Sequence, residues 1–126
     1  MRIQVSEAAP RVIDYFTARS QGLCFDATAD AVPAYTADPA LAAPIVSALR
    51  LRNLNMHEDE ERQVGIASID LPPCQHCQHY GKTALIAALR CHLTVVYGNF
   101  IEIPDELIDD QLNYRNLWSS SARCAE

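Results

Sequence analysis

Glycine is scarce in this sequence, at 4 of 126 residues, and long apolar runs are missing. Loops that cradle phosphate groups use several closely spaced glycines, so the sequence predicts no glycine-rich nucleotide site. No stretch free of formal charge exceeds 11 residues, and the one from Cys91 to Ile101 includes a histidine and an asparagine. A membrane helix needs about 20 predominantly apolar residues. These shortages argue against a phosphate-loop enzyme and against a membrane-spanning protein.

Basic residues are also few, at 10 against 16 acidic ones, which gives a net charge of −6. Affinity for nucleic acid comes largely from basic side chains, so direct binding of nucleic acid is not expected. An acidic surface suits a basic protein partner instead. The densest acidic run, His57 to Glu61, is interpreted as a solvated turn between two strands. The alternative is a mimic of DNA phosphates that occupies a nucleic-acid site on another protein.

The N-terminus lacks the pattern of a secretion signal, because Met1 to Glu7 holds no apolar stretch and ends in a carboxylate. Five cysteines form an odd set, which fits free thiols or metal ligands better than a disulfide framework. We therefore expect a cytoplasmic protein. The cysteines are Cys24, Cys74, Cys77, Cys91 and Cys124.

Apolar periodicity predicts a strand over 2–5 and a helix from about Ala8 to Ser20, with Pro10 in its first turn. The segment 22–43 is expected to be an extended loop, because Pro33 and Pro39 interrupt it. A short helix is predicted over 45–49.

Two further segments, 50–56 and 64–69, are predicted to form a hairpin. The clearest helix runs from Thr83, a candidate N-cap, to Tyr97, with Gly98 as its C-cap. A short last helix is expected over 105–111. The apolar stripe of the clearest helix consists of Leu85, Leu89, Leu93 and Val96, widened by Ile86 and Ala88.

These elements predict a single α+β domain over residues 1–112, followed by a loosely held tail over 113–126. Its small antiparallel sheet would combine the N-terminal strand with the hairpin, and the two main helices would pack on one face.

The cluster from Cys74 to His79 holds the densest set of metal-ligand side chains. Cys74 and Cys77 have the spacing at which two thiolates reach one tetrahedral zinc ion. His79 could supply a third ligand, and either Cys91 or His92 a fourth. Because Cys91 and His92 are adjacent on a helix, only one of them can readily face such a site. The alternative interpretation is a polar loop with incidental thiols and no bound metal.

Two other candidate sites are less well supported by their surroundings. A redox role for Cys74 and Cys77 would need a helix beginning at the first cysteine, and Pro72 and Pro73 precede it instead. The carboxylates of the last predicted helix could hold a hard cation, but no further oxygen ligands accompany them. They are Asp105, Glu106, Asp109 and Asp110.

Several segments occur in a recognisable order: Met1 to Glu7, then Ile13 to Gly22, then Ala43 to Val46. The most specific follow in Gly81 to His92 and Ile103 to Leu107. This order resembles the phage NinX-like proteins, a family of small domains of unknown function in tailed phages and prophages. The resemblance covers about residues 1–107, and the cysteine cluster lies outside its pattern. It implies an accessory role in a phage and assigns no catalytic residue.

Three kinds of function remain open. We expect a non-enzymatic phage accessory protein that binds a host or phage protein through an acidic, partly apolar surface, including the case of a nuclease inhibitor that mimics DNA. The second is an interaction module stabilised by zinc on Cys74, Cys77 and His79. The third is a small thiol enzyme.

Overall fold

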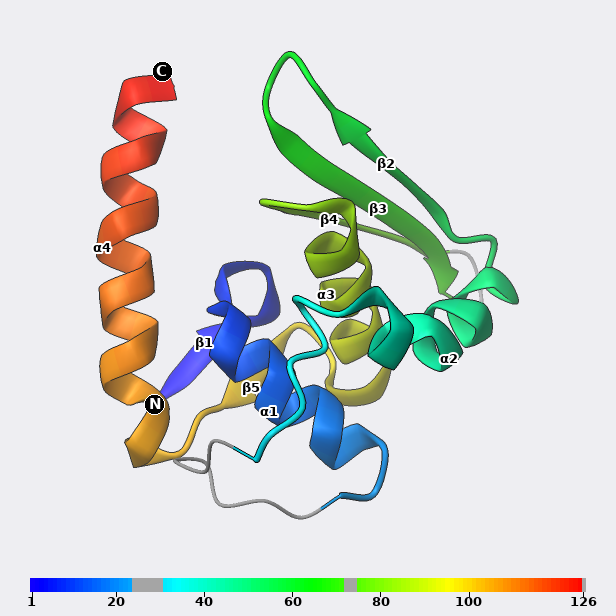
Figure 1. Ribbon diagram of the computed structural model, residues 1–126, viewed down its shortest axis with the longest axis horizontal. Coiled ribbons are helices and arrows are strands. Elements are labelled where there is room, and N and C mark those ends of the chain that lie inside the picture. The colour runs from blue at the N-terminus through cyan, green and yellow to red at the C-terminus, as the bar shows by residue number, and fades with distance from the viewer. Residues whose placement is uncertain (24–30, 72–74, 126) are drawn as a thin grey trace.

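The computed structural model describes residues 1–23, 31–71 and 75–125, with the backbone alone for residue 75 and residues 117–125. Within these ranges it is an α+β domain, as predicted (Figure 1). The helices are α1 (Pro10–Ser20), α2 (Pro39–Arg50), α3 (Ala84–Tyr97) and α4 (Ile108–Ala125), with 3-10 turns η1 (Val5–Glu7) and η2 (Asp105–Leu107). The strands are β1 (Arg2–Gln4), β2 (Asn55–Asp59), β3 (Val64–Leu71), β4 (Gln75–Gly81) and β5 (Phe100–Glu102).

The strands form two separate antiparallel sheets, β1-β5 and β2-β3-β4. The prediction that the N-terminal strand joins the hairpin was therefore wrong. Ile3 pairs instead with Ile101, and the Val5 amide donates to the Asn99 carbonyl at 2.9 Å. Strands of three residues have too little sequence pattern to specify which strand they pair with. The pairing of β1 with β5 is instead set by the path of the chain after α3, which brings β5 beside β1.

The predicted hairpin is present, but β2 begins at Asn55 because residues 50–54 end α2 and form the following turn. Figure 1 shows β2 and β3 extending beyond α1, α2 and α3. The acidic run lies in β2 and its turn. The Glu58 carboxylate accepts a hydrogen bond from the Ala84 amide at 3.1 Å, and the Asp59 carboxylate accepts one from the Glu61 amide at 3.1 Å. Two of the acidic side chains therefore hold the backbone in place.

The segment predicted as a polar cysteine-containing loop is strand β4, which pairs with β3 and places Ile69 opposite Cys77 and Ala67 opposite His79. Its side chains alternate, so Cys77 and His79 point inward and are buried while their neighbours are exposed. Sequence patterning missed this strand because its buried side chains are a cysteine and a histidine instead of aliphatic residues.

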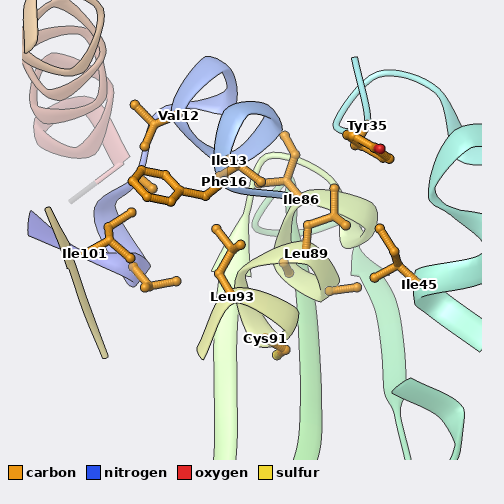
Figure 2. Close-up of a cluster of buried hydrophobic side chains, with 14 of the residues drawn as sticks. Val12, Ile13, Phe16, Tyr35, Ile45, Ile86, Leu89, Cys91, Leu93 and Ile101 are labelled. Atoms are coloured by element: carbon orange, nitrogen blue, oxygen red, sulfur yellow. The ribbon is translucent and has the colours of Figure 1, made fainter. Parts of the chain in front are cut away.

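Helix α3 lies at the centre of the domain, between the three-stranded sheet and α1. The Thr83 side chain caps it by accepting from the Ile86 amide at 3.2 Å, and Gly98, with φ of 87°, ends it as predicted. Figure 2 shows Leu89 and Leu93 facing α1, with Cys91 on the opposite side of α3. Both faces are therefore buried, and the expectation that both main helices rest on the sheet was wrong. Of the predicted stripe, Val96 is exposed.

Helix α2 begins at Pro39, which was predicted to break helices, and contains Pro44. Proline is tolerated at the first helical position because the amide there needs no helical partner. The Asp38 side chain caps this end by accepting from the Ala40 amide at 3.0 Å. The expected loop over 22–43 therefore ends earlier than predicted, and residues 24–30 within it lie outside the described residues.

The last helix also differs from its prediction, since α4 continues to Ala125 instead of ending at Gln111. Tyr114 and Arg115, within the predicted tail, contact the body of the domain, as described below. Residue 111 itself is fully buried, which anchors the start of α4. None of the helices that the structure describes has the length and apolar character needed to cross a membrane.

Replacing Leu89, which is fully buried in the core cluster, with alanine should lower the free energy of unfolding by about 2–5 kcal/mol. Leu51→Ala is the matched control, because Leu51 is 89% exposed and its loss should change stability by less than about 0.5 kcal/mol. Denaturant titration followed by circular dichroism measures both. Equal, small losses would show that the core is not centred on α3.

The free energy of unfolding should also depend on pH through His92, whose Nε2 lies 2.8 Å from the Ser20 hydroxyl oxygen of α1. Burial lowers the pKa of His92 below its usual 6.5, so the folded protein binds this proton less readily than the unfolded chain. The free energy of unfolding should therefore be fully retained above about pH 6.5 and fall as the pH drops below it. His92→Gln should flatten this dependence, whereas His57→Gln, an exposed control, should leave it intact.

Candidate functional site

A pocket of about 260 Å³ lies where four elements meet: η1, β4, α3 and α4. It is lined by Ser6, Glu7, Gln78, His79, Tyr80, Arg90, Tyr114 and Arg115. This set includes two arginines and two tyrosines, so the lining is rich in hydrogen-bond donors.

Arg90 is the central side chain of this pocket, and it is only 3% exposed. One guanidinium nitrogen donates to the Tyr80 carbonyl at 2.5 Å, and the other donates to the Ala8 carbonyl at 2.7 Å and the Tyr114 hydroxyl at 3.1 Å. All of these acceptors are neutral. Nε has no hydrogen-bond partner, and no carboxylate among the described residues forms an ion pair with Arg90. Buried charges are normally paired, so this pocket holds an unbalanced positive charge.

A second arginine lies at the rim. Arg115 is 3.5 Å from a Glu7 carboxylate oxygen, and both side chains are about half exposed. Exposed ion pairs are weak, so this contact can open with little loss of free energy. Arg115 is therefore available to a ligand that enters the pocket.

Gln111 positions the α4 side of the pocket. Its side-chain oxygen accepts from the Ala9 amide and its side-chain nitrogen donates to the Glu7 carbonyl, both at 2.8 Å. The amide thus satisfies backbone groups at the junction of η1 and α1. Tyr114 and Arg115 follow three and four residues later, on the same face of α4, which directs them toward α3.

A buried thiol cluster lies beside this pocket, between β4 and α3. His79 Nε2 is 2.8 Å from the Thr94 hydroxyl oxygen, which in turn donates to the Arg90 carbonyl at 3.1 Å. Cys91 is fully buried, and its sulfur lies 3.5 Å from the Ala67 carbonyl oxygen. Cys77 lies on the same inward face of β4 as His79. The cluster forms because β4 turns every second side chain inward, and residues 91 and 94 share one face of α3.

The two cysteines have opposite titration behaviour. The hydrogen bond with the Cys91 thiol lowers the pKa of Cys77 to about 5, against the effect of burial, and His79 and Thr94 add to the lowering. The pKa of Cys91 is raised, first by its hydrogen bond with Cys77 and then by burial. The cluster therefore favours a thiolate at Cys77 and a thiol at Cys91.

Cys77 is reached from outside through a shallow depression of about 360 Å³. Its own exposure is 8%, whereas that of Cys91 is zero. His79 borders both this depression and the arginine pocket, so the two lie on either side of one side chain. The depression is lined by Leu71, His76, Cys77, Gln78, His79, Thr94 and Asn99.

The structure brings together three of the four predicted zinc ligands, Cys77, His79 and Cys91, and leaves Cys74 outside the described residues. Among the described side chains, no group of three histidine, cysteine or carboxylate residues could hold a metal ion. One nitrogen of His79 is already bound to Thr94. The neighbouring His92 faces α1, in keeping with the prediction that only one of the pair at 91 and 92 faces the cluster.

The carboxylates proposed as a possible cation site are all exposed, at Asp105, Glu106, Asp109 and Asp110. Asp110 pairs with Arg11 at 3.2 Å. Asp105 lies in η2 and Asp109 in α4, so the helix on which they were expected to share a face is interrupted.

Sequence reasoning missed the arginine pocket, although one signal was present. Arg90 stands between Leu89 and Cys91 inside the most apolar helix of the chain, where a charged side chain has to be buried. Its companion Tyr114 carried no such signal, because α4 beyond Gln111 has no clear apolar period.

Comparison with protein families finds none whose pattern matches this chain. The curated proteins likewise include no significant match to it.

Proposed function

We propose that this protein is a non-enzymatic binding module that holds a host or phage protein by one of its carboxylate groups. The observation that carries the proposal is the buried guanidinium of Arg90, whose acceptors among the described residues are all neutral. A carboxylate bound in the pocket supplies the missing negative charge. Arginine donors arranged in a fork suit a planar carboxylate.

Charge favours a carboxylate over a polyphosphate as the bound group. The chain carries a net charge of −6, and Glu7 lines the pocket itself. A multiply charged anion is repelled by both, whereas a single carboxylate is balanced by Arg90 and Arg115. A volume of about 260 Å³ also accommodates a side chain or a chain terminus and not a nucleic-acid strand.

Aromatic residues at the rim favour a protein as the source of the carboxylate. Tyr80 is 47% exposed beside the pocket, and Tyr114 reaches into it. Tyrosine and arginine are the residues that most often dominate binding energy at protein interfaces. The partner would therefore place an aspartate, a glutamate or its C-terminus in the pocket and rest apolar atoms on Tyr80.

The acidic hairpin supports mimicry of DNA less well. Glu58 and Asp59 accept hydrogen bonds from backbone amides of this chain, so part of the acidic run stabilises the fold. The remaining charge of the run is that of an ordinary solvated turn. We therefore assign the binding role to the arginine pocket.

The setting that we propose is the cytoplasm of a phage-infected bacterium. Cys77 and Cys91 are both free thiols, which is the state favoured by a reducing compartment. The resemblance of the chain to the phage NinX-like proteins supports the assignment to a phage accessory protein.

Titration of the labelled protein with acetate, and with a short peptide that has a free C-terminal carboxylate, tests the proposal. Both should produce saturable NMR shifts at the Arg90 and Arg115 guanidinium groups. Arg115→Gln should weaken binding about fivefold, as expected for loss of a partly exposed charge contact. Arg50→Gln, an exposed arginine on α2, is the matched control and should bind normally.

The same peptide should release a captured partner from the protein immobilised in lysate of infected cells. A peptide amidated at its C-terminus, and otherwise lacking carboxylates, should neither bind nor compete. Equal binding of the free and amidated peptides, or unchanged affinity of Arg115→Gln, would contradict a carboxylate-binding role.

A further inference from the structure

The thiol cluster is a second feature, independent of the arginine pocket. Its two cysteines come from different elements: Cys77 lies on the inward face of β4, and Cys91 lies on the face of α3 that packs on the sheet, with its sulfur 3.5 Å from the Ala67 carbonyl oxygen of β3. His79, on the same face of β4 as Cys77, contacts Thr94, on the same face of α3 as Cys91, at 2.8 Å, so the two thiols face each other across this interface. Neither cysteine is bonded in the structure.

The two sulfurs differ in access. Cys77 borders the depression on the surface, and Cys91 is sealed beneath it against the Ala67 carbonyl. A small oxidant can therefore reach Cys77 first and cannot reach Cys91 directly. This asymmetry is the arrangement of a reacting thiol with a resolving thiol behind it.

The surroundings of Cys77 stabilise its ionised form. Hydrogen bonding with Cys91, and then with His79 and Thr94, lowers the pKa of the Cys77 thiol. Hydrogen bonds to a charged group favour that charged form, and the thiolate is the nucleophile in thiol oxidation. The His79 ring is itself held by Thr94 at 2.8 Å, which keeps it next to the sulfur.

We propose that Cys77 and Cys91 form a thiol pair that hydrogen peroxide oxidises reversibly to a disulfide between β4 and α3. The Cys77 thiolate attacks one peroxide oxygen, the O–O bond breaks, and the departing hydroxide takes a proton and leaves as water. Cys77 is now a sulfenic acid. The Cys91 sulfur then attacks the Cys77 sulfur, and the hydroxyl group leaves as a second water with the Cys91 proton. Two thiols have lost two electrons, and one peroxide has gained them.

This pairing differs from the one that the sequence suggests. Cys74 and Cys77 are three residues apart and would be the obvious redox pair, but β4 turns Cys77 inward, toward the helix that carries Cys91. The proposal therefore predicts a cross-link between two distant tryptic peptides. One spans residues 63–82, and the other begins at Cys91.

Mass spectrometry of the full chain treated with hydrogen peroxide under native conditions tests the proposal. The expected product has lost two hydrogens and joins those two peptides, with fragment ions that place the bond at Cys77. Reductant should restore the original mass. Cys74→Ser is the matched control, and it should form the same bond at the same rate.

Removing the resolving thiol tests the order of events. In Cys91→Ser, peroxide should leave a sulfenic acid at Cys77 that reacts with dimedone, whereas the wild-type chain should give little of this adduct. Cys91→Ala serves where the serine variant does not fold, as judged by circular dichroism. A bond between Cys74 and Cys77, oxidation of Cys77 without a bond to Cys91, or no oxidation of Cys77 would each overturn the proposal.

Discussion

The close packing of α3 on the three-stranded sheet is the constraint on which the rest of the structure depends. Gly65 makes it possible, because a Cβ atom at this position would lie 2.0 Å from the Ala84 backbone nitrogen. Gly81, opposite it in the neighbouring strand, leaves room for Ile86 in the same way. With the sheet this near, α3 is buried on both faces, and α1 closes over the side that the sheet does not cover.

Two chemically unusual features follow from this burial. A helix enclosed on both faces has little room for polar side chains, yet α3 carries Arg90 and Thr94 into the interior. Arg90 emerges at the end of the sheet where α4 closes the gap and forms the arginine pocket. Thr94 and Cys91 face the sheet and meet His79 and Cys77. The binding proposal and the redox proposal thus arise from neighbouring side chains on the same side of one helix.

Much of the local structure could be predicted from the sequence, since caps and prolines act over a few residues. Thr83 and Gly98 bound α3 as expected, and Pro10 starts α1. The predictions were wrong where the surrounding residues overrode a local rule. Pro39 became the first residue of a helix because Asp38 caps it, and β4 was missed because its inward side chains are not aliphatic.

The sequence by itself determined the α+β class, the boundaries of α1 and α3 and the presence of the β2–β3 hairpin, because each depends on short-range periodicity or on a capping residue. The pairing of β1 with β5, the burial of Arg90 among neutral acceptors and the meeting of Cys77 with Cys91 were decided by the tertiary structure alone. Each of these joins residues that are far apart in the chain or lie on different elements. Only the packing of α3 against the sheet, α1 and α4 brings them together.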